Sequence, residues 1–254
     1  DMSVGNIVGS NIFNTLMILG VTALISPLII TKSNLKRDIP LNIAVTAILI
    51  FLGMKNSLFG IGQDCLTRVD GVIMLAIFAW YLWRSFRTPS DDCEESSEDI
   101  KTFSGAVSAC LIIAGLAALI GGGKMFVHSA TAIAEYLHLS EKFIAITVMA
   151  AGTSLPELAT CAVAATKGHG QLALGNILGS NVSNILLILG GSALIHPLSF
   201  AGMTPVDLGV VMIAAVFILS SAYTFRVNKL DRFEGGVLLA MEIGYMIWLF
   251  VNPA

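Results

Sequence analysis

A carboxylate lies in the middle of an apolar stretch of this sequence. Glu157 follows Thr153 and Ser154 by four and three residues, so that the three side chains share one face of a helix. Placing a carboxylate inside a membrane costs about 2.5–3.5 kcal/mol on insertion scales, which makes it a functional group by default. Carboxylate and hydroxyl oxygens replace water around hard cations such as Ca²⁺ or Na⁺. The stretch therefore predicts a cation site inside a membrane.

Pro156 adds backbone oxygens to this predicted site. It has no N–H, and its ring clashes with the carbonyl of Gly152, so the helix should bend here. The bend should leave the carbonyl oxygens from Ala150 to Gly152 without hydrogen-bond partners. We therefore expect these oxygens to face the cation together with the side chains.

A second polar face follows after a short turn. Asn176, Ser180 and Asn184 recur at every fourth position and line one face of the next helix. Alone, a Ser or Thr in a membrane helix usually bonds a carbonyl of its own helix, and an Asn usually joins two helices. Their proximity to Glu157 favours one cation site closed by the two helices.

The composition is that of an integral membrane protein. Of the 254 residues, 56% are hydrophobic and 12% are charged, against about 25% charged in globular chains. The net charge of −3 offers no basic surface for nucleic acid. The four cysteines show no spacing typical of a zinc site or a disulfide framework. We therefore expect the lipid bilayer and small ions as partners, and no nucleic acid.

Apolar runs long enough to cross the hydrocarbon core, about 20 residues each, predict an all-α fold. The fourth run contains three consecutive glycines, 121–123, where its helix should break or tilt. The acidic stretch 84–102 is predicted to be a cytoplasmic loop that separates a first part, 1–83, from a second, 103–254. The eight predicted spans are 4–30, 40–54, 69–83, 103–137, 143–166, 172–195, 206–224 and 233–251.

An internal repeat relates the two parts. Residues 1–28 align without gaps to residues 171–198, and 16 of the 28 positions are identical. Ser10 and Asn14 match Ser180 and Asn184, so the polar face occurs twice. The second part holds five spans, an odd number, so a complete first half would be followed by a copy inserted upside down. Such inverted repeats place the substrate site at the bilayer midplane, on broken helices.

The motif GTSLPE, followed by GNILGSNVSN and its duplicate GNIVGSNIFN, resembles the alpha repeats of bacterial-type sodium/calcium exchangers in the cation/calcium antiporter superfamily. The resemblance covers nearly the whole chain. It implies an inverted-repeat transporter of ten spans that exchanges Na⁺ for Ca²⁺ by alternating access at a midplane site. For individual residues it implies Glu157 and Thr153 as Ca²⁺ ligands, Ser154, Ser180, Ser10 and the Ala150 carbonyl as Na⁺ ligands, and Asn14 and Asn184 at the centre.

The resemblance also implies a multi-pass protein of the bacterial inner (plasma) membrane that is not an enzyme and needs no cofactor. Many family members carry Asp where this chain has Asn184, so one ionisable group is absent from the centre of the site. The two spans that would precede Asp1, with a second Glu, are not in this sequence. We therefore expect an N-terminally truncated chain, with the missing spans required to complete the site.

Two other functions remain open. A proton-coupled Ca²⁺ antiporter would share this architecture, although Asn14 and Asn184 at the centre favour Na⁺. An intramembrane hydrolase would use Ser154 as nucleophile, which requires an oriented base, and all four histidines fall near the ends of predicted spans. A membrane scaffold without chemistry does not explain the duplicated polar face. Glu242, inside the last span, receives no role.

Overall fold

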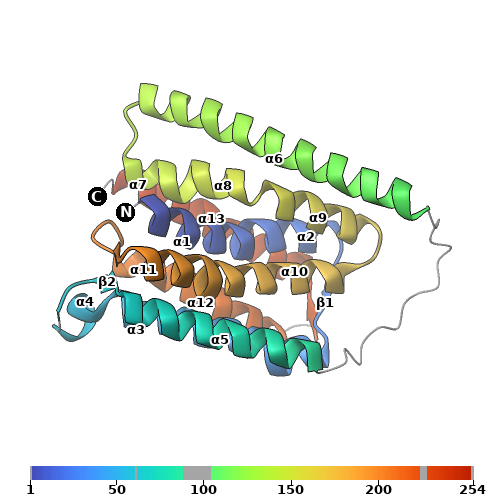
Figure 1. Ribbon diagram of the computed structural model, residues 1–254. Coiled ribbons are helices and arrows are strands. Elements are labelled where there is room, and N and C mark those ends of the chain that lie inside the picture. The colour runs from blue at the N-terminus through green and yellow to red at the C-terminus, as the bar shows by residue number, and fades with distance from the viewer. Residues whose placement is uncertain (1, 61, 88–103, 224–227, 253–254) are drawn as a thin grey trace.

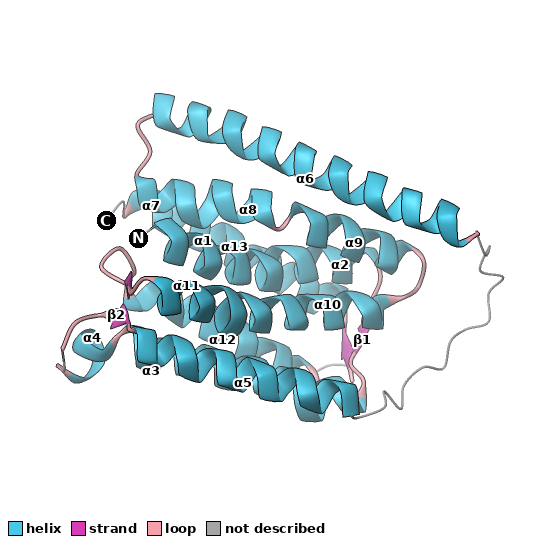
Figure 2. Ribbon diagram, in the orientation of Figure 1, coloured by secondary structure: helices cyan, strands magenta, loops and turns pink. Residues whose placement is uncertain are grey.

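The computed structural model describes residues 2–60, 62–87, 104–223 and 228–252, and these are mostly helical (Figure 2). The all-α prediction is therefore confirmed. Labels beginning with η denote π-helical stretches. The elements are α1 (Met2–Ile12), η1 (Phe13–Ile18), α2 (Leu19–Ile25), β1 (Leu28–Ile29), η2 (Asn34–Asp38), α3 (Ile39–Gly53), α4 (Lys55–Phe59), β2 (Cys65–Leu66), α5 (Arg68–Arg87), α6 (Gly105–Tyr136), α7 (Glu141–Ile144), η3 (Ala145–Met149), α8 (Ala150–Thr153), α9 (Leu155–Thr166), α10 (Gly170–Ser183), η4 (Asn184–Leu189), α11 (Gly190–Ile195), β3 (Leu198–Ser199), α12 (Pro205–Ser221), β4 (Lys229–Leu230) and α13 (Arg232–Val251).

The two copies of the repeat have the same local structure and opposite directions. The segments α1–η1–α2 and α10–η4–α11 both contain a π-helical stretch at the same place in the repeat, a feature often found at functional sites. Strand β1 pairs with β4 and strand β2 with β3, both antiparallel. These pairs lie at opposite ends of the bundle (Figure 2). Since β1 and β3 hold equivalent places in the two copies, one copy is inverted relative to the other.

Glycines allow close contact between the copies at two equivalent crossings. A Cβ on Gly235 would lie 2.9 Å from the carbonyl oxygen of Gly20, where α13 meets α2. A Cβ on Gly71 would lie 2.6 Å from the carbonyl oxygen of Gly190, where α5 meets α11. Real Cβ atoms rarely come so close, so both crossings depend on the missing side chain.

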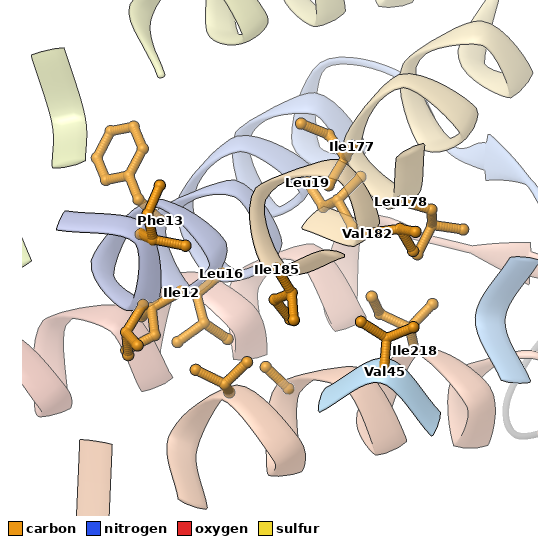
Figure 3. Close-up of a cluster of buried hydrophobic side chains, with 14 of the residues drawn as sticks. Ile12, Phe13, Leu16, Leu19, Val45, Ile177, Leu178, Val182, Ile185 and Ile218 are labelled. Carbon is orange, nitrogen blue, oxygen red and sulfur yellow. The ribbon is translucent and has the colours of Figure 1, made fainter. Parts of the chain in front are cut away.

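The apolar core lies where the two copies cross. Its side chains are supplied by α1, η1 and α2 from the first copy and by α10 and η4 from the second, with α3 and α12 closing the far side (Figure 3). This packing holds the polar faces of α1 and α10 in a fixed relation. Figure 3 labels Ile12, Phe13, Leu16, Leu19, Val45, Ile177, Leu178, Val182, Ile185 and Ile218.

Helix α6 lies along one side of the bundle (Figure 1). Its 32 residues form one continuous helix through glycines 121–123, so the break considered from the sequence does not occur. A Cβ on Gly123 would lie 3.2 Å from the Gly152 carbonyl oxygen, which marks a close approach of α6 to α8. At about 1.5 Å per residue the helix exceeds the roughly 30 Å hydrocarbon core, a mismatch that tilting can accommodate.

By length and composition, five described helices could each cross a membrane, and the bent pair 141–153 and 155–166 would make a sixth. The predicted spans 40–54 and 206–224 correspond to the shorter helices α3 and α12. The count of eight therefore stays a prediction. The loop predicted at 84–102 starts too early, because α5 continues to Arg87. Most of the loop lies outside the described residues.

The continuation of α5 has a local cause. The Arg84 guanidinium lies 5.5 Å from the ring centroid of Trp80, and that of Arg87 lies 4.5 Å from the ring centroid of Trp83. In each pair the residues are four positions apart, and such contacts favour the helical conformation. These contacts carry the helix past the point where its apolar run ends.

Candidate cation site

The bend predicted at Pro156 is present and shapes the site. The helical axis turns by 49° between Thr153 and Leu155. The Ser154 N–H donates to the carbonyl oxygens of both Ala150 and Ala151, each at 3.1 Å. The prediction that the Ala150 carbonyl lacks a partner is therefore wrong, because the chain tightens into a turn before the proline and the Ser154 N–H serves two carbonyls.

Thr153 at this bend contacts the first copy of the repeat. The hydroxyls of Ser10 and Thr153 are hydrogen-bonded at 3.0 Å, and the Thr153 Oγ1 also lies 3.0 Å from the Ala150 carbonyl oxygen. The contact depends on Gly9, where a Cβ would collide with the backbone of Ile146. Ser10 therefore reaches Thr153 because the preceding residue has no side chain.

Glu157, one helical turn beyond Thr153, contacts the second copy. The Ser180 Oγ donates to Glu157 Oε1 at 3.1 Å. Next to it, the Asn176 Nδ2 donates to Cys161 Sγ at 3.6 Å, which packs α10 against α9. Glu157 is half-buried, and none of the ion pairs within the described part of the chain includes it. Its carboxylate charge is therefore open to a cation.

The central asparagines join the same cluster. The Asn14 Nδ2 donates to Asn181 Oδ1 at 3.1 Å and lies 3.5 Å from Ser180 Oγ. The Asn184 Nδ2 donates to Asn11 Oδ1 at 3.0 Å. Asn14 thus connects the first copy to Ser180, and through it to Glu157.

Most of the residues predicted from the sequence lie together. Hydrogen bonds link Ser10 to Thr153, and Ser180 both to Glu157 and to Asn14. Ser154 is buried in the bend between these two groups, while Asn184 contacts the opposite helix. Carboxylate, hydroxyl and amide oxygens from both copies thus belong to one hydrogen-bonded region, and such oxygens suit hard cations.

Sequence reasoning missed Asn11 and Asn181. Both are buried, and both bond across the two copies. The available signal was their position in the duplicated GSN motif. They were passed over because they lie off the every-fourth-residue face that contains Ser180 and Asn184.

A cavity of about 710 Å³ lies between α6 and the bent helix pair and reaches Thr153. From the bent pair it is lined by Met149, Gly152, Thr153 and Pro156, and from α6 by Leu119, Ile120, Gly123, Lys124, Val127, His128, Thr131, Ala132 and Glu135. Thr153 is correspondingly exposed. One side of the candidate site is therefore open toward α6.

The chain belongs to the sodium/calcium exchanger protein family, whose model matches residues 1–87 and 107–251. The family resemblance seen in the sequence is thereby confirmed, and the chain is a multi-pass integral membrane protein rather than an enzyme. It is 35% identical to a putative antiporter, CaxA, of Alkalimonas amylolytica over 98% of this chain and 79% of that protein. It is 32% identical to the sodium/calcium exchanger MaX1 of Methanosarcina acetivorans over 97% and 79%, respectively.

Among solved structures, the chain is similar to the sodium-calcium exchanger NCX_Mj soaked with Na⁺. The TM-score is 0.76 at 32% sequence identity, over 98% of this chain and 77% of that one. This likeness supports the inverted-repeat transporter fold.

Proposed function

We propose that this chain exchanges Na⁺ for Ca²⁺ across a bacterial inner membrane by alternating access. The observation that carries this proposal is the joining of both repeats around one carboxylate. Ser180 of the second copy bonds Glu157, and Ser10 of the first copy bonds Thr153 one turn away. The homologous inner membrane protein YrbG of Escherichia coli, 35% identical over 78% of this chain and 61% of its own length, supports the location.

In this site, Glu157 and Thr153 bind Ca²⁺, and Na⁺ binds at the neighbouring oxygens. The Na⁺ ligands are the Ser154, Ser180 and Ser10 hydroxyls and the Ala150 carbonyl, with Asn14 and Asn184 at the centre. The Thr153 hydroxyl would turn from the Ala150 carbonyl to admit an ion there, since hydroxyl groups rotate freely. Both ions compete for one negative charge and an overlapping set of oxygens. Occupancy by one therefore opposes occupancy by the other, which is the basis of exchange.

Access to the site follows from its position beside α6. The cavity along α6 reaches Thr153, and cations would approach the site from that side. Because the repeats are inverted, rearranging one copy relative to the other can open the opposite side instead.

The test is ion exchange in vesicles that contain the purified full-length protein. Vesicles loaded with Na⁺ should accumulate ⁴⁵Ca²⁺ after dilution into Na⁺-free buffer, and vesicles with equal Na⁺ on both sides should not. A pH gradient without a Na⁺ gradient is the control for proton coupling. Uptake that ignores Na⁺ and follows pH would refute Na⁺ coupling.

The hydrolase alternative finds no support. It requires a base beside Ser154, and within the described residues no hydrogen bond joins a histidine to that side chain. Ser154 instead lies buried at the helix bend, where its backbone N–H forms the turn.

A further inference from the structure

Two buried asparagines outside the proposed ligand set join the copies of the repeat. Asn11 and Asn181 hold equivalent places, three residues before Asn14 and Asn184, respectively. They are only 1% and 2% exposed. The hydrogen bonds of their side chains run to the opposite copy rather than along their own helices. Such bonds determine how the amide groups of the opposite copy are turned.

One branch of this network starts at a backbone carbonyl. The Asn11 Nδ2 donates to the Asn181 carbonyl oxygen at 3.3 Å, and the Asn184 Nδ2 donates to Asn11 Oδ1 at 3.0 Å. Because a carbonyl oxygen can only accept, Asn11 must present its NH₂ group there and its Oδ1 to Asn184. Asn184 must in turn present its NH₂ group to Asn11. The Asn184 Oδ1 therefore points away from Asn11.

The other branch runs in the opposite direction and starts at a hydroxyl group. The Asn181 Nδ2 donates to Thr15 Oγ1 at 2.8 Å, and the Asn14 Nδ2 donates to Asn181 Oδ1 at 3.1 Å. The Asn14 Oδ1 is buried and has no hydrogen-bond partner in the described part of the chain. A buried acceptor without a donor costs free energy. A cation within reach of this oxygen would compensate for that cost.

We propose that Asn11 and Asn181 are positioning residues that orient the amides of Asn184 and Asn14, respectively, with their carbonyl oxygens toward the transported cation. The NH₂ end of an amide repels a cation and its oxygen binds one, so an unrestrained amide offers the wrong end part of the time. Restraint by an outer hydrogen bond removes this misoriented state and lowers the ordering cost of binding. The inference rests on the proposed function only in taking Na⁺ and Ca²⁺ as the ions bound near Glu157.

The test is equilibrium binding of ⁴⁵Ca²⁺ to the purified full-length protein in a double-mutant cycle. Asn11→Leu removes the acceptor at similar volume and should weaken binding about tenfold or more, since partners that orient metal ligands typically contribute roughly 10–100-fold. In the background of Asn184→Ala, which removes the oriented amide, Asn11→Leu should have no further effect. Thr22→Val is the matched control and should bind as the wild type does. Thr22 is buried, and its hydroxyl donates only to Ile18 of its own helix.

Two outcomes would overturn the inference. One is wild-type affinity in Asn11→Leu, and the other is equal weakening by Asn11→Leu with and without Asn184, which a general packing defect would produce. If Asn11→Leu does not fold, the cycle of Asn181→Ala with Asn14→Ala gives the same test on the other branch. There, too, the effect should vanish once the oriented amide is removed.

Vesicle exchange separates this inference from the proposed function. Protein that binds ⁴⁵Ca²⁺ and shows the predicted coupling, but fails to exchange it for Na⁺, would refute the exchange and support the positioning role. Protein that exchanges normally while Asn11→Leu binds Ca²⁺ as the wild type does would refute the positioning role alone.

Discussion

Replacing Glu157 by Gln removes the charge at the centre of the site with little change in shape. The carboxylate accepts a hydrogen bond from Ser180 at 3.1 Å, and Gln can accept the same bond through its amide oxygen. Two unit charges at 4 Å attract by about 4 kcal/mol at an effective dielectric constant of about 20. A divalent ion doubles this attraction, and desolvation of the ion and the carboxylate offsets much of it.

We therefore expect Glu157→Gln to reduce the free energy of Ca²⁺ binding by about 3 kcal/mol or more. Since about 1.4 kcal/mol corresponds to a factor of ten, Glu157→Gln should weaken Ca²⁺ binding about a hundredfold and abolish Na⁺-driven ⁴⁵Ca²⁺ uptake in vesicles. The variant should still insert and fold, because a neutral amide costs less to bury than a carboxylate. Circular dichroism and thermal unfolding in detergent would check this.

Glu141→Gln is the matched control. Glu141 is exposed in the first turn of α7, where its charge contributes at most about 1 kcal/mol to helix stability. The same chemical change there should leave binding and exchange unaltered. The reasoning would be refuted if Glu157→Gln exchanged Ca²⁺ at the wild-type rate, because the ion would then bind elsewhere.

Three further predictions follow from contacts at the site and elsewhere in the bundle. Gly9→Ala should destabilise the fold by about 1–3 kcal/mol through overpacking and weaken Ca²⁺ binding. Gly179→Ala is the control at the equivalent place in the second copy and should be near neutral, because a Cβ there would have no atom within 4 Å. Equal melting temperatures of the two variants would contradict this prediction. Lys142 forms a 2.9 Å ion pair with Asp207, and the two side chains are 4% and 0% exposed, respectively. Lys142→Met should lower the free energy of unfolding in urea by about 3–5 kcal/mol, because it leaves the buried Asp207 without its ion-pair partner. The double variant Lys142→Met with Asp207→Asn should recover part of that loss, and no recovery would argue against the ion pair as the cause. Asn184→Ala should leave measurable Ca²⁺ uptake with altered Na⁺ dependence, because it removes a dipole and not a charge; complete loss of uptake would show that this position is indispensable.

Local patterns in the sequence were sufficient to predict the parts of the site. The bend could be predicted because Pro156 lacks an N–H wherever it occurs. Glu157 could be singled out because a carboxylate in an apolar span is costly in any fold. The alignment of Ser10 and Asn14 with Ser180 and Asn184 needed only the repeat, and an odd number of spans in the second part was enough to infer inversion.

Other features could not be predicted because they depend on the detailed geometry of contacts and not on residue type and spacing alone. The role of Gly9 appears only when α1 meets the backbone of Ile146. The Ala150 carbonyl was expected to be free, yet the exact turn before the proline gives it the Ser154 N–H. The extent of α5 was likewise underestimated, since arginine–tryptophan contacts prolong a helix whose apolar run has ended.

The sequence by itself thus determined which oxygen-bearing side chains this protein offers to a cation and that they occur in two inverted copies, because residue type and helical periodicity are local properties. Only the tertiary structure decided which of these side chains meet. Ser10 reaches Thr153 because Gly9 lets α1 approach the backbone of Ile146. Asn11 and Asn181 bond across the copies although they are 170 positions apart in the sequence. The direction in which each amide points is set by partners on the opposite copy, and no local pattern specifies it.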